Sequence, residues 1–94
     1  MFKLKDILGL DHLSDRKARY LSGGNKRKLC CAIALIKTPR ILFMDEASNG
    51  VDPISRKLLY SYLKSLKSTS TLIITHRIDE AEKICDRIAI MAEG

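Results

Sequence analysis

Several features common in other protein classes are absent from this 94-residue chain, which contains no tryptophan and no glutamine. Its longest apolar run, at about residues 29–36, is far shorter than the ~20 residues that a bilayer-spanning helix needs. The three cysteines, Cys30, Cys31 and Cys85, are odd in number and lack CxxC spacing. A disulfide scaffold and a zinc site are therefore not expected. A reducing compartment is expected instead.

The composition is that of a globular protein, because 46% of the residues are hydrophobic and 30% are charged. The formal net charge of +6 permits an anionic partner, which could be a nucleotide, a nucleic acid or a membrane surface. The N-terminal apolar stretch carries Asp6 and no small-residue cleavage site, so it predicts an amphipathic helix over residues 2–10 rather than a signal peptide.

Alternating helical and strand patterns predict an α/β fold with a parallel sheet. Short apolar runs predict strands at about 41–45, 72–75 and 87–91, and the run at 41–45 is typical of a strand buried on both faces. Helices are expected at about 24–37, from Pro53 to about Leu66, and at 78–85. Three short strands make only part of a sheet, which favours the middle or end of an α/β domain.

The helix at 24–37 has apolar residues at i, i+3, i+4 and i+7, which are Leu29, Ala32, Ile33 and Ile36. This spacing predicts one buried stripe along the helix. Its basic residues Lys26, Arg27, Lys28 and Lys37 largely occupy the opposite face. They favour a solvated surface over a nucleic-acid site, although the charge pattern leaves both open.

Two acidic residues, Asp45 and Glu46, end the first predicted strand. Ligands of α/β sheets bind beyond the carboxyl ends of strands, and neighbouring strand residues point in different directions. One carboxylate can hold Mg²⁺ through its water shell while the other faces a reacting water, as in nucleoside triphosphatases. The alternative is a strand that ends in an ordinary polar turn.

The stretch LSGG precedes the helix at 24–37. Ser22 is a candidate cap for this helix, and Gly23 and Gly24 leave backbone N–H groups open to close approach. A helix N-terminus of this kind attracts anions, phosphate above all. A flexible loop before an amphipathic helix explains the same residues without a ligand.

His76 ends the second predicted strand and could donate a hydrogen bond to a phosphate oxygen, although a lone histidine is more often structural. The segment SNGVD, residues 48–52, follows the acidic pair. Asp52 is positioned to cap the helix that begins at Pro53, so this segment has a purely structural interpretation as well.

In their order and spacing, the four motifs LSGG, Asp-Glu, SNGVD and Thr-His resemble the ATP-binding-cassette (ABC) ATPase domain from about Leu8 to Gly94. The resemblance implies a partial P-loop NTPase (RecA-like) core, with residues 1–94 as the C-terminal part of one nucleotide-binding domain. GNKRKL, GVDP and DRIAIMAEG are most similar to the A subfamily of ABC transporters. The family function is ATP binding and hydrolysis that powers transmembrane transport.

The resemblance also implies roles for single residues and for partners. Residues 21–25 match the signature motif, in which Ser22, Gly23, Gly24 and Asn25 would contact the γ-phosphate of ATP held by a second nucleotide-binding domain, in a head-to-tail ATP sandwich. The transmembrane domains of a transporter are the other expected partner, and nucleic acid is not expected. The expected location is therefore the cytoplasmic face of a membrane.

The remaining motif residues match positions around the hydrolysed ATP itself. By the resemblance, Asp45 assists Mg²⁺ binding, Glu46 is the general base, His76 contacts the γ-phosphate, and Asp52 lies at the dimer seam as part of the D-loop. Ala47 departs from the family pattern, which usually has proline there.

The family's phosphate-binding motif GxxxxGK[ST] does not occur in the 94 residues, and without glutamine there is no Q-loop. We therefore expect a fragment of an ATPase domain that is inactive in isolation for lack of the P-loop lysine. An alternative is a non-catalytic product that pairs with another nucleotide-binding domain through its signature motif.

Overall fold

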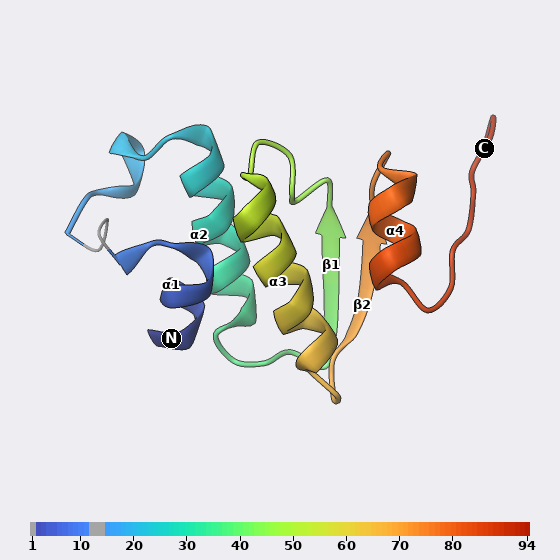
Figure 1. Cartoon of the computed structure of the whole chain (residues 1–94), viewed down its shortest axis with the longest axis horizontal. Coiled ribbons are helices and arrows are strands. Elements are labelled where there is room, and N and C mark those ends of the chain that lie inside the picture. The colour runs from blue at the N-terminus through green and yellow to red at the C-terminus, as the bar shows by residue number, and fades with distance from the viewer. Residues whose placement is uncertain (1, 12–14) are drawn as a thin grey trace.

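The computed structural model of the protein describes residues 2–11 and 15–94. In chain order the elements are α1 (Phe2–Leu8), the short 3-10 helix η2 (Ala18–Tyr20), α2 (Gly23–Leu35), β1 (Ile41–Asp45), α3 (Pro53–Ser65), β2 (Ser70–Ile74) and α4 (Ile78–Ile84). The predicted α/β class is confirmed. In Figure 1 the helices α1, α2 and α3 lie together beside β1, and α4 lies beyond β2.

Strands β1 and β2 pair in parallel, as the sequence predicted. The pairing begins where the Ser70 N–H donates to the Arg40 carbonyl at 2.8 Å. At the other end Asp45 lies opposite Ile74, and the Glu46 N–H donates to the Ile74 carbonyl at 2.9 Å. Both strands therefore end at the same edge of the sheet, and the residues that follow them are neighbours.

The helices α2 and α3 begin at the two capping residues that the sequence indicates. Ser22 Oγ accepts a hydrogen bond from the Asn25 N–H at 3.2 Å, and Asp52 Oδ2 accepts one from the Ser55 N–H at 2.9 Å. Pro53 occupies the first turn of α3, where its missing N–H removes no helical hydrogen bond. Both caps lie on the side of the molecule to which the strands point (Figure 1).

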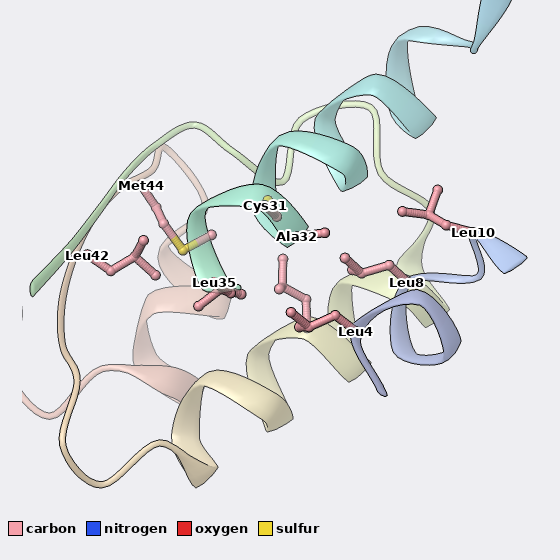
Figure 2. Close-up of a cluster of buried hydrophobic side chains, with 9 residues drawn as sticks. Leu4, Leu8, Leu10, Cys31, Ala32, Leu35, Leu42 and Met44 are labelled. Atoms are coloured by element: carbon pink, nitrogen blue, oxygen red, sulfur yellow. The ribbon is translucent and has the colours of Figure 1, made fainter. Parts of the chain in front are cut away.

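The core lies between α1, α2, α3 and one face of β1 (Figure 2). Its buried members are Leu4, Leu8, Leu10, Cys31, Ala32, Leu35, Leu42, Met44 and Leu59. Leu8 and Ala32 have no exposed surface at all. Burying each leucine of this cluster contributes about 2 kcal/mol to the stability of the fold.

The predicted buried stripe of α2 is wrong, although the helix itself is present. The buried residues are Lys28, Cys31, Ala32 and Leu35, whereas Ile33 and Ile36 are exposed. The helix carries two apolar stripes at the same spacing, and periodicity alone cannot tell which of them meets α1 and β1. The helix also ends two residues before the predicted Lys37, in a turn where Thr38 takes a φ of 46°.

The prediction that β1 is buried on both faces is also wrong. Leu42 and Met44 are buried, but Phe43 is 74% exposed on the opposite face. The register places the exposed Leu72 of β2 directly beside Phe43. The open sheet face consists of Ile41, Phe43, Leu72 and Ile74.

The predicted strand at 87–91 does not form, because residues 85–94 contain neither helix nor strand. Ile90 and Met91 are 85% and 84% exposed. Figure 1 shows this tail running beyond α4, with no strand alongside it. A strand requires a neighbour for its N–H and C=O groups, and no described segment supplies one here.

The open sheet face predicts self-association of the chain. Replacing Phe43 with lysine places a charge at the centre of this face, so we expect F43K to shift the chain toward the monomer in sedimentation velocity. Ile54→Lys is the matched control, because Ile54 is 75% exposed but lies on α3. Equal sedimentation of wild type, F43K and I54K would show that this face does not drive association.

Candidate functional site

Glu46 and His76 lie side by side because Glu46 directly follows β1 and His76 comes two residues after the end of β2, its parallel partner. His76 Nδ1 is 3.1 Å from both carboxylate oxygens of Glu46. A neutral imidazole that donates from Nδ1 leaves Nε2 free as an acceptor, while a protonated one can donate from both nitrogens. The His76 side chain is 68% exposed, so this contact orients the two groups and contributes little to stability.

The backbone of Glu46 is held in an uncommon conformation, with a φ of 50°. Its N–H donates to Ile74, and its carbonyl accepts hydrogen bonds from Arg27 Nη1 at 2.9 Å and from the Asn49 N–H at 3.1 Å. These three bonds come from β2, from α2 and from the loop after β1. They satisfy both the N–H and the carbonyl of Glu46.

Asp45 is exposed at the end of β1, on the same face of the sheet as Phe43. Glu46 takes the next position along the chain, so the two carboxylates leave the strand in different directions. One accessible carboxylate fits Mg²⁺, which usually binds proteins through one or two carboxylates while it keeps several waters. No cluster of three or more histidine, cysteine or acidic residues that could hold a metal occurs within 2–11 and 15–94.

The segment LSGG forms the cap and first turn of α2, and its two glycines have different surroundings. A Cβ on Gly23 would meet nothing within 4 Å, so its backbone is open to approach. A Cβ on Gly24 would collide with the carbonyl oxygen of Gly50. The sequence interpretation assigned both glycines to open amides, but Gly24 also allows α2 to pack against the loop 46–52.

The loop 46–52 ends at Asp52, which is held by a second contact from α2. Lys28 Nζ lies 2.7 Å from Asp52 Oδ1, and the side chains of these residues are 11% and 49% exposed. The hydrogen bond from Lys28, together with the one from the Ser55 N–H, holds the pKa of Asp52 well below its ordinary value. Asp52 therefore links α2 to α3 as well as capping α3.

Sequence reasoning placed Arg27 and Lys28 on a solvated basic face and missed both contacts. A signal for Lys28 was present, since it shares the helical spacing 28, 31, 32, 35 with the buried residues of α2. A lysine at a buried position needs an acidic partner, and Asp52 is that partner. No comparable signal marked Arg27, whose contact depends on how the loop folds.

Three further side chains that the sequence did not indicate, Arg56, Tyr60 and Glu80, fix the helix that follows His76. Glu80 on α4 lies 2.5 Å from Arg56 Nε, and it accepts a hydrogen bond from the Tyr60 hydroxyl at 3.1 Å. Burial raises the pKa of Tyr60, so this hydroxyl stays protonated and able to donate even well above neutral pH. The contacts of Glu80 with Arg56 and Tyr60 join α4 to α3. They thereby limit where the segment between β2 and α4, which carries His76, can lie.

Comparison with known proteins shows the family of the chain. The family model described as ABC transporter matches residues 2–49. The chain is 45% identical over 89 residues to the phospholipid-transporting ATPase ABCA3 of Homo sapiens, covering 94% of this chain and 5% of that protein. It is 42% identical over 93 residues to ABC transporter A family member 4 of Arabidopsis thaliana, covering 97% of this chain and 10% of that protein.

The chain belongs to the ABC transporter family. Its relatives in the A subfamily confirm the subfamily that GNKRKL and GVDP predicted. The structure matches a nucleotide-free ATP-binding cassette from an ABC transporter with a TM-score of 0.69 and 36% identity, covering 90% of this chain and 34% of the cassette. The ABC chain thus has the fold of about a third of a cassette, and it spans a tenth or less of the two relatives.

The matched structure is an ATP-binding cassette, so nucleotide binding is a property of that protein. No helix within the described part of this ABC chain is long and apolar enough to cross a membrane.

The contact between Gly24 and Gly50 predicts unequal effects of alanine at the two signature glycines. G24A must displace the loop 46–52, so we expect it to lower the free energy of unfolding by about 1–3 kcal/mol. G23A adds a methyl group in open space and is expected to be neutral or stabilising by up to about 1 kcal/mol. Urea unfolding followed by circular dichroism measures both, and equal losses would contradict the packing described.

The ion pair between Lys28 and Asp52 predicts a pH dependence of stability. Because the folded-state pKa of Asp52 is lowered, its contribution is present above the unfolded pKa of about 3.9 and is lost as the pH falls below it. Asp52→Asn keeps a good helix cap but removes the charge, at a cost of about 1 kcal/mol at neutral pH.

The measurement is the free energy of unfolding of wild type and D52N between about pH 6 and pH 3. The difference between the two proteins is expected to shrink as the pH falls. Asp79→Asn is the control, because Asp79 is an exposed acidic residue of α4. A difference between wild type and D52N that stays constant over this range would rule out the ion pair as its cause.

Proposed function

We propose that the chain is the C-terminal part of one ABC nucleotide-binding domain and that it contributes the hydrolytic side of an ATP site powering transmembrane transport. The observation that carries this proposal is the contact between Glu46 and His76 at the ends of two parallel strands. A carboxylate and an imidazole at this edge of an α/β sheet suit the hydrolysis of a bound phosphoanhydride.

Glu46 is the general base in this proposal. The oxygen of a water attacks the γ-phosphorus, the bond from this phosphorus to the β–γ bridging oxygen breaks, and ADP leaves. Glu46 accepts the proton of the attacking water, and its contact with His76 keeps the carboxylate turned toward the strand ends. His76 is 68% exposed, and in its protonated form Nε2 can donate a hydrogen bond to a γ-phosphate oxygen while Nδ1 donates to Glu46.

Asp45 would hold Mg²⁺ through its water shell, and a bound Mg²⁺ neutralises charge on the β- and γ-phosphates. The exposed carboxylate of Asp45 at the strand end suits this role. The P-loop that binds the same phosphates has no counterpart among the 94 residues, so we expect the chain in isolation not to hydrolyse ATP.

The signature motif is proposed to act on a different nucleotide. Ser22, Gly23, Gly24 and Asn25 form the cap and first turn of α2, where the backbone of Gly23 is open to approach and the positive end of the helix favours a phosphate. By family resemblance this phosphate belongs to ATP on a second nucleotide-binding domain, with Asp52 near the seam. Transmembrane domains of a transporter, and thus the cytoplasmic face of a membrane, complete the proposed setting.

Substitution of Glu46 tests the proposal in a fusion of this chain to an upstream segment that supplies the P-loop of a related cassette. We expect Glu46→Gln to lower kcat for ATP by about 100-fold or more while the KM changes little, because a general base contributes 10²–10⁴-fold. Glu82→Gln is the control, since Glu82 is an exposed glutamate on α4. ATP turnover by E46Q at the rate of E82Q would show that Glu46 is not the base.

A further inference from the structure

Glu46 needs help from outside its own strand to keep its conformation. A φ of 50° is uncommon for a residue that is not glycine, and it persists only where surrounding contacts impose it. The bond from the Glu46 N–H to Ile74 is an ordinary extension of the strand pairing. The constraint on the carbonyl side comes from Asn49 within the loop and from Arg27 outside it.

Arg27 reaches this carbonyl because α2 contacts the loop 46–52 both before and after Arg27 along the helix. One turn earlier, Gly24 packs against the Gly50 carbonyl. One residue later, Lys28 pairs with Asp52 at 2.7 Å. With the helix fixed at these two points, the Arg27 guanidinium donates to the Glu46 carbonyl at 2.9 Å across 19 residues of sequence.

We propose that Arg27 is a positioning residue for Glu46. Its guanidinium holds the Glu46 peptide so that the side chain leaves the sheet edge toward His76 rather than relaxing to the usual strand direction. A charged donor to a carbonyl is stronger than a neutral one, and the planar guanidinium limits the direction of approach. The inference rests on the proposed function, in which the Glu46 carboxylate takes the proton of the attacking water.

Three variants test the role of Arg27, namely Arg27→Ala, Arg27→Lys and the control Lys26→Ala. Lys26 is the neighbouring exposed cation on α2, and K26A removes the same charge without touching Glu46. In the fusion that supplies a P-loop we expect R27A to lower kcat by about tenfold with the KM for ATP unchanged, because misplacing a reacting group costs rate rather than binding. R27K, which retains a charged donor, is expected to recover most of this rate, and K26A is expected to match wild type.

Hydrogen–deuterium exchange of the 94-residue chain gives an independent readout that needs no ATP hydrolysis. R27A is expected to speed exchange in peptides covering residues 45–52 and to leave those of α3 unchanged, whereas a general loss of stability would speed exchange throughout. Unchanged exchange at 45–52 in R27A, or a kcat equal to that of wild type, overturns the proposal. If E46Q leaves ATP turnover intact, the proposed function fails, and the exchange of R27A still decides whether Arg27 holds Glu46.

Discussion

The parallel pairing of β1 with β2 is the constraint on which the rest of the site depends. It brings Glu46 and His76, 30 residues apart in sequence, to within 3.1 Å. Because parallel strands end at the same edge, the pairing also places the loop 46–52 next to the N-terminus of α2. A change in strand register would separate the carboxylate from the imidazole without altering either residue.

Around this edge, α2 acts as a scaffold for the loop that follows β1. Three residues of α2 that lie within positions 24–28 make the contacts with this loop. Gly24 packs against Gly50, Arg27 donates to the Glu46 carbonyl, and Lys28 pairs with Asp52. The buried cluster of Figure 2 fixes the other end of α2 through Cys31, Ala32 and Leu35. Packing in the core is therefore coupled to the geometry of the candidate site.

Two parts of the structure lack the packing partners that such parts normally have. One face of the sheet is covered by helices, while the other exposes Phe43 and its apolar neighbours. A parallel sheet is normally covered on both faces, and the matched cassette is about three times as long as the aligned part of this chain. The open sheet face and the unpaired residues 87–91 both require partners that the described residues do not supply.

Local sequence alone was enough to predict several features of this protein. Capping by Ser22 and Asp52, the strand at 41–45 and the identity of the four motifs depend on residues close in sequence, so their signals were readable directly. Tertiary structure alone decided which stripe of α2 is buried, that Gly24 packs against Gly50, and that Arg27 and Lys28 bind the loop. These contacts join residues 19 to 26 positions apart, and helical periodicity constrains direction around one helix but not the position of its neighbours.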